Sequence, residues 1–273
     1  MGPRERIRRV VRHVAGRMVD CHEAPIIVLG NQKAGTSAIA ALLGRASGLS
    51  TTIDLRNEIS RPTFHRLRDG GLDFEQFVSG NRLDFSRRIV KEPNLSLFHA
   101  ELAAAFPKAR FVFIFREPRD NVRSILNRLK VPGDLDDIDF RDWPEITPAW
   151  QLVLDSRWAG IGGDRYIARL AQRWRYLAEV YLRQPEHFLL VRYEDFRSDK
   201  RAAIHSLCRQ LDLPVVADIS DQVDRSFQPP GRRDTDLVEF FGANYGLFDE
   251  ICGNAMDRLG YPAATLPAES VTA

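Results

Sequence analysis

Residues 25–44 most strongly limit what this chain can fold into, because they read as a strand, a glycine-bounded turn and a helix. Ile26 to Leu29 form a short apolar, β-branched run of the kind that builds buried parallel strands. Apolar residues then recur at helical spacing until Gly48, namely Ile39, Leu42, Leu43 and Ala46. The stretch predicts a βα unit of an α/β fold.

The turn between this strand and helix suits an anion. Gly30 and Gly35 lie five residues apart, and Thr36 and Ser37 open the helix. Such a turn directs backbone N–H groups and the positive helix end towards one point, which favours phosphate or sulfate. The spacing is close to the P-loop pattern G-x-x-x-x-G-K-[ST], but Thr36 takes the lysine position and Lys33 precedes it. Two interpretations are open: a phosphate loop whose lysine has moved, or an ordinary βα turn with an N-cap threonine.

The rest of the chain alternates between strands and helices. The patterns predict a helix capped by Asn94 over 94–106, a strand at 110–115 followed by a helix near Pro118, a helix over 165–183, a strand at 188–191, and helices over 199–211 and from Phe248 to a C-cap at Gly260. We therefore expect a three-layer, P-loop-like α/β fold with a central parallel sheet flanked by helices. Ligands of such sheets bind at the carboxyl ends of the strands, which places the 30–37 turn, Arg116 and Tyr193 on one edge.

The 273 residues suggest a single domain over 25–262. Around it we expect a basic amphipathic helix over 1–24, a lid-like insertion at 131–163 that carries three of the four tryptophans, and a flexible tail at 263–273. The N-terminal helix either packs on the domain as a solvated helix or lies on an anionic membrane.

Composition limits the partners. A net charge of +2 offers no basis for nucleic-acid binding, and no apolar run approaches the length of a membrane span. The three cysteines are scattered outside any CxxC motif, which is typical of a reducing compartment. We expect a cytoplasmic protein that is either free or associated with a membrane through its N-terminal helix.

The predicted strand at 111–115 distinguishes two kinds of phosphate chemistry. A nucleotide-hydrolysing P-loop enzyme holds Mg²⁺ with a loop hydroxyl and an acid that ends a later strand. Here that strand ends in Arg116, which repels Mg²⁺ and attracts phosphate. Together with the absence of lysine at position 36, Arg116 indicates a phosphorylated nucleotide bound without a metal.

Three motifs occur in order along the chain. Gln32 to Ser37 matches [PQ]-K-x-G-T-[TS], and a strand followed by Arg116, Pro118, Asp120 and Ser124 matches R-x-P-x-D-x-x-x-S. A third apolar strand leads into R-Y-E-D at 192–195. Over about residues 25–260 the chain thereby resembles the sulfotransferases that use 3′-phosphoadenosine 5′-phosphosulfate (PAPS).

The resemblance implies roles for the matched residues. The 5′-phosphosulfate would be cradled by the loop residues Lys33, Ala34, Gly35, Thr36 and Ser37. Arg116 and Ser124 would hold the 3′-phosphate, which suits an arginine fork beside a hydroxyl. Arg232 and Arg233 resemble the basic loop that closes over the nucleotide, although this chain has Gly-Arg-Arg where soluble members have Arg-Lys-Gly. Tyr193 either lines the nucleotide pocket or is a core tyrosine at a strand end.

The residue that deprotonates the acceptor is less obvious. Soluble phenol and steroid enzymes use a histidine in a K-T-H motif, whereas here Lys91 is followed by Glu-Pro-Asn. This resembles the K-D-P form of the protein-tyrosine and some carbohydrate sulfotransferases, in which a glutamate set among arginines is the base. Glu58 fits that description and is our expected base, with Asp54, His65 and Glu92 as alternatives. Lys33 and Lys91 are the expected catalytic cations.

The resemblance thus implies in-line, metal-free transfer of a sulfuryl group from PAPS, releasing adenosine 3′,5′-bisphosphate (PAP). The acceptor would be a hydroxyl or amine of a sugar, glycolipid, peptidyl tyrosine or small natural product, with carbohydrate or glycolipid favoured. Two other classes remain open, namely a P-loop kinase or NTPase with a displaced lysine, and a non-catalytic nucleotide-binding module.

Overall fold

The computed structural model of the protein describes residues 16, 18–223 and 236–262. The predicted N-terminal helix, apart from its last positions, lies outside the described residues, as do Arg232, Arg233 and the tail at 263–273.

The centre of the molecule is a five-stranded parallel sheet in the order β2-β3-β1-β4-β5. The strands are β1 (Ile26–Gly30), β2 (Thr51–Ile53), β3 (Ile89–Lys91), β4 (Arg110–Phe115) and β5 (Phe188–Arg192). The register sets Gly30 opposite Ile114, and Phe115 opposite Arg192. The first loop and the residues after β4 and β5 therefore meet at the carboxyl edge of the sheet. The predicted α/β fold with a parallel sheet is confirmed.

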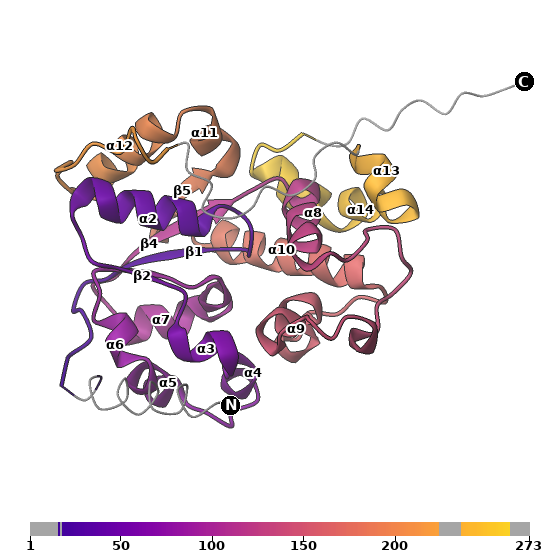
Figure 1. Ribbon diagram of the computed structural model, residues 1–273, viewed down its shortest axis with the longest axis horizontal. Coiled ribbons are helices and arrows are strands. Elements are labelled where there is room, and N and C mark those ends of the chain that lie inside the picture. The colour runs from indigo at the N-terminus through magenta and orange to yellow at the C-terminus, as the bar shows by residue number, and fades with distance from the viewer. Residues whose placement is uncertain (1–15, 17, 224–235, 263–273) are drawn as a thin grey trace, which may run out of the picture.

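Helices cover both faces of the sheet, as Figure 1 shows. Alternate strand residues such as Ile26 and Val28 pack against α2 (Thr36–Ser47), α11 (Tyr193–Ser198) and α12 (Lys200–Gln210). The other face, with Ile27 and Leu29, lies in the larger core. The elements of that side include α3 (Arg56–Ser60), α4 (Phe64–Arg68), α5 (Phe74–Gly80), α6 (Arg82–Phe85), α7 (His99–Ala105), α8 (Pro118–Leu129), α10 (Tyr166–Arg183), α13 (Leu237–Phe241) and α14 (Leu247–Arg258).

Two features differ from the sequence-based expectations. The strands β2 and β3 were not predicted, because three residues each are too few to carry a periodicity. The prediction that Asn94 caps a helix was wrong. A 3₁₀ helix, η1 (Pro93–Phe98), precedes α7, and the Glu92 side chain caps it by accepting a hydrogen bond from the Asn94 backbone N–H. The Asn94 side chain is directed elsewhere, because its Oδ1 accepts a hydrogen bond from Gln32 in the loop between β1 and α2.

The insertion at 131–163 is partly helical, with η2 (Phe140–Asp142), α9 (Pro148–Leu154) and η3 (Ser156–Ala159). All three of its tryptophans are partly buried against the larger core. The Trp158 ring stacks on Phe98 with 6.4 Å between centroids, and its Nε1 donates to the Leu152 carbonyl at 2.7 Å. The insertion is therefore docked on the core, and its role as a lid stays a prediction. None of the described helices is long and apolar enough to cross a membrane.

Candidate active site

The loop between β1 and α2 requires both of its glycines. Gly30 has a φ of 138°, and a Cβ atom there would lie 2.4 Å from the Ile114 carbonyl oxygen. Gly35 has a φ of 95°, and its Cβ would lie 2.5 Å from the ring of Tyr193. Gly35 is also the N-cap of α2, whose first residue is Thr36, so no side chain caps this helix. The interpretation with an N-cap threonine is therefore wrong, and the first N–H groups of α2 remain available to an anion.

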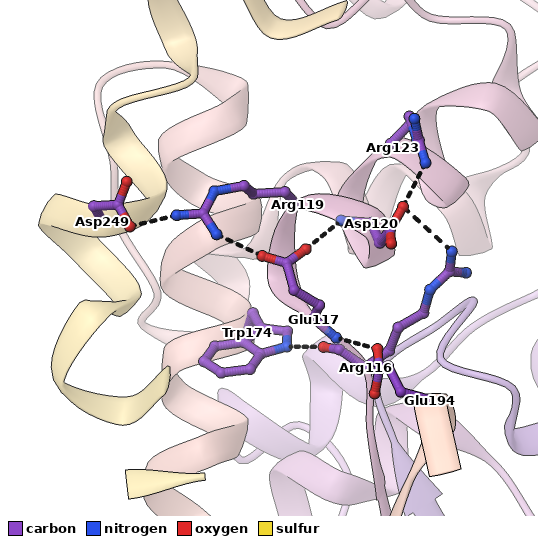
Figure 2. A network of polar contacts seen from close by, with 8 residues as sticks. All are labelled: Arg116, Glu117, Arg119, Asp120, Arg123, Trp174, Glu194 and Asp249. Carbon is purple, nitrogen blue, oxygen red and sulfur yellow. Dashed lines mark hydrogen bonds and ion pairs between the residues drawn. The ribbon is translucent and has the colours of Figure 1, made fainter. Parts of the chain in front are cut away.

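Arg116 connects this loop to β5. Its Nη1 donates to the Lys33 carbonyl at 3.3 Å, and its guanidinium lies 4.7 Å from the centre of the Tyr193 ring. The Trp174 indole in turn donates to the Arg116 carbonyl at 2.9 Å (Figure 2). The side chain of Arg116 is buried and lies 3.7 Å from Asp120. As the sequence predicted, the loop, Arg116 and Tyr193 share one edge of the sheet.

A network of carboxylates fixes the turn that follows Arg116 (Figure 2). The Glu117 N–H donates to Glu194 at 2.9 Å, and the Glu117 carboxylate accepts from the Asp120 N–H at 2.8 Å. Arg119, which is buried, contacts both Glu117 and Asp249. The glutamate of the R-Y-E-D motif thus holds the start of α8, the helix that carries Ser124.

Cations gather at the loop. Burial, together with repulsion from Arg128, Arg116 and Lys91, lowers the pKa of Lys33 to about 8. Positive groups that raise one another's energy in this way are stabilised by a bound anion. The half-buried Lys33 also has a φ of 65°, a left-handed conformation that non-glycine residues seldom adopt outside turns and functional sites.

Asp54 and Glu92 contribute negative charge next to this cluster. Asp54 follows β2, and its Oδ1 lies 2.5 Å from Lys91 Nζ. The fully buried Glu92 accepts hydrogen bonds from the N–H groups of Leu55 and Asn94. Burial raises the pKa of Glu92 to about 7, and the Asp54 carboxylate acts in the same direction. A lysine and two carboxylates therefore adjoin the loop.

Glu58 lies in a different setting. It is buried on α3, and its carboxylate accepts from the backbone N–H of Thr63 at 2.5 Å and from the Thr63 hydroxyl at 3.0 Å. Burial raises the pKa of Glu58, while its hydrogen bonds to Thr63 and Asn81 oppose the shift. His65 lies farther along the chain, on α4. Asp54, in contrast, contacts Lys91 of the site.

Comparison with known proteins decides the family. A model of the Sulfotransferase family matches residues 65–218, which is more than half of the chain and includes the second and third motifs. The chain belongs to the sulfotransferase family. It is a sulfotransferase enzyme, although no curated protein sequence matches it.

Solved sulfotransferases share the fold. STF9 from Mycobacterium avium is 14% identical with a TM-score of 0.55, and the match covers 93% of this chain and 81% of the other. STF1 from Mycobacterium tuberculosis H37Rv is 15% identical with a TM-score of 0.52, over 89% and 80% of the two chains. The sulfotransferase domain from the curacin biosynthetic pathway is 14% identical with a TM-score of 0.51, over 90% and 100%.

The lowered pKa of Lys33 predicts a proton linkage in this sulfotransferase. A bound polyanion stabilises the ammonium, so PAP binding should be accompanied by the uptake of up to about half a proton between about pH 8 and pH 9, and of little at about pH 7. Calorimetric titrations in two buffers of different ionisation enthalpy measure this uptake. Lys33→Ala should abolish the uptake at the higher pH. If the uptake persisted in that variant, another group would be responsible.

Proposed function

We propose that this sulfotransferase transfers the sulfuryl group of PAPS to a hydroxyl group and releases PAP. The proposal depends on one observation, the clustering of basic side chains at the uncapped N-terminal end of α2. Lys91, Arg116 and Arg128 are close enough to Lys33 to lower its pKa, and the loop beside them has the glycines that a phosphate needs. A donor with a 5′-phosphosulfate and a 3′-phosphate complements that charge.

Two groups of residues would hold the donor. The N–H groups of Ala34 to Ser37, at the start of α2, suit the 5′-phosphate. Arg116 and Ser124 suit the 3′-phosphate, since Arg116 directly follows β4 and Ser124 lies about two turns into α8. The ring of Tyr193, which already contacts Gly35 and Arg116, is our candidate wall of the nucleotide pocket.

The transfer breaks the bond between sulfur and the oxygen that bridges to phosphate, and forms a bond from sulfur to the acceptor oxygen. Negative charge builds on the bridging oxygen, where Lys33 would stabilise it. Lys91 would stabilise the transferring group. Preorganised cations of this kind typically lower a barrier by about 3–4 kcal/mol each. The charge is supplied by these side chains, so metal-free transfer is part of the proposal. No described group of three or more His, Cys, Asp and Glu side chains could hold a metal ion.

The acceptor proton goes to a carboxylate, and we propose Asp54 in preference to Glu58. Asp54 is more than a third exposed and contacts Lys91, whereas Glu58 is buried with both oxygens at Thr63. Asp54 also has a φ of 60°. Of the four described non-glycine residues with positive φ, two end helices, and the other two are Lys33 and Asp54. When the donor attracts Lys91, the Asp54 carboxylate becomes free to accept a proton.

Transfer of labelled sulfuryl from PAPS to a panel of hydroxyl and amine acceptors tests both the reaction and the base. Wild type should label an acceptor, with carbohydrates and glycolipids favoured by the resemblance of the segment at Lys91. Asp54→Asn should lose about 10²–10⁴-fold in kcat while it keeps its affinity for PAP. Glu58→Gln is the matched variant and should retain transfer. The reverse result would return the role of base to Glu58.

A further inference from the structure

An arginine that is completely buried lies behind the loop between β1 and α2. This loop, residues 31–35, is called the donor loop. Arg173, in the middle of α10, is 0% exposed. Its Nε donates to Asn31 Oδ1 at 3.1 Å and its Nη1 to Ser156 Oγ at 3.2 Å. Its Nη2 donates to Gln32 Oε1 at 3.1 Å and to Asn94 Oδ1 at 2.9 Å. These four hydrogen-bond acceptors are neutral.

The amides around this guanidinium bind one another as well. Asn31 donates to Asn121 Oδ1 at 2.8 Å, and Asn121 donates to the Gln32 carbonyl at 2.8 Å. Gln32 Nε2 then donates to Asn94 Oδ1 at 2.9 Å. Asn31 and Gln32 thereby keep their side-chain oxygens turned towards Arg173, because their N–H₂ groups are engaged elsewhere. The guanidinium and the amides form one closed network.

This network joins the three segments that carry the proposed site. Asn31 and Gln32 begin the donor loop, directly before Lys33. Asn94 lies on η1, three residues after Lys91. Asn121 lies on α8, between Arg116 and Ser124. Arg173 therefore contacts the segments that carry Lys33 and Lys91 directly, and it reaches α8 through Asn31 and Asn121.

Such an arrangement costs folding free energy. A buried ion without a charged partner loses its hydration, and neutral oxygens compensate for only part of that loss. Burial lowers the pKa of Arg173 to about 10, with Glu92 opposing the shift, so the guanidinium remains charged at neutral pH. An apolar side chain could fill the same space without this cost, but it could not hold three polar segments together.

We propose that Arg173 is a positioning residue for sulfuryl transfer. It holds the donor loop, the Lys91 segment and α8 in fixed positions relative to one another. The proposal rests on the proposed function. A positioning residue differs from an arginine that only stabilises the fold, because misalignment of the three segments should affect turnover much more than nucleotide binding. Misplacement of reacting groups by about 1 Å can cost about 10²-fold in rate.

The test compares Arg173→Met with Arg169→Met. Arg169 lies one turn earlier on the same helix, is also buried, and binds Asp137 and the Gly163 carbonyl of the insertion. We expect Arg173→Met to lose about 10²-fold in kcat and less than about 10-fold in PAP affinity. Arg169→Met should lose stability but keep kcat. Arg173→Lys keeps the charge and should fold, and an intermediate kcat is expected because an ammonium lacks the planar fork.

Hydrogen exchange of the same variants tests the positioning role of Arg173 without a measurement of turnover. Arg173→Met, or Arg173→Lys if the former does not fold, should speed exchange of backbone amides in 31–37, 93–98 and 117–124 together, while Arg169→Met should not. Coordinated loosening would support the proposal even if no acceptor were labelled, in which case only the proposed function would be in doubt. Faster exchange confined to α10, or equal losses of kcat in the two arginine variants, would overturn it.

Discussion

Lys33→Ala should lower kcat for sulfuryl transfer by about 10²–10³-fold, as expected when one preorganised group that stabilises transition-state charge is removed. PAP should bind less than about 10-fold more weakly, because the 5′-phosphate is held mainly by N–H groups at the start of α2. The loss of kcat should exceed the loss of PAP affinity because the charge that Lys33 stabilises develops during the reaction. The bridging oxygen carries its full charge only as the bond to sulfur breaks, so the Lys33 ammonium contributes most in the transition state.

Lys33→Asn is the matched second variant. Lys33 has a left-handed backbone, which asparagine adopts more readily than alanine, so this change keeps the loop conformation while removing the charge. Both variants should therefore lose turnover to a similar extent. If Lys33→Asn transferred at the wild-type rate, the lysine would have only a conformational role, and the charge at the bridging oxygen would have to come from Lys91 or another cation.

Arg116→Ala should weaken PAP binding by about 10²-fold, the cost of removing one partner of a buried, charged hydrogen-bonded pair. The loss should be specific for the 3′-phosphate. Binding of adenosine 5′-monophosphate, which lacks that group, should change little in comparison. Calorimetric titration of both nucleotides into wild type and variant gives the coupling between Arg116 and the 3′-phosphate directly.

Arg110→Ala is the control for Arg116→Ala. Arg110 begins the same strand at its opposite end and forms an exposed ion pair with Asp212. Its removal should leave the affinity for both nucleotides unchanged, since surface ion pairs contribute little and this one lies at the far edge of the sheet. An equal loss for the two nucleotides in Arg116→Ala would mean that Arg116 supports the loop through the Lys33 carbonyl and does not bind the 3′-phosphate.

Much of the sheet edge could be predicted because its signals are local. Each of the strands β1, β4 and β5 has five or more residues and is followed by a polar motif. The edge strand β2 and its neighbour β3 have three residues each. Their identity as strands depends on the pairing of β3 with β1 and of β2 with β3, which is a non-local property. Asp54 and Lys91 meet only because these two short strands lie side by side.

The network around Arg173 could not be predicted from the sequence for a related reason. Residues 165–183 show a clear amphipathic pattern, and Arg173 reads as part of the polar face of that helix. In the structure it is buried, because amides from the loop and η1 converge on it from distant parts of the sequence, and Asn121 of α8 binds one of these amides. Asn94 was assigned to a helix cap for the same reason, since a local rule applied to it before its distant partner was known.

Calorimetric titration of the wild-type protein with PAP and, separately, with Mg-ATP measures whether the loop and Arg116 accept a nucleotide with a 3′-phosphate. A sulfuryl-transfer site predicts that PAP binds stoichiometrically and that Mg-ATP does not bind, because an arginine follows β4 where an NTPase has a metal-binding acid. Binding of Mg-ATP without binding of PAP would contradict the account and favour a phosphoryl-transfer enzyme with a displaced lysine.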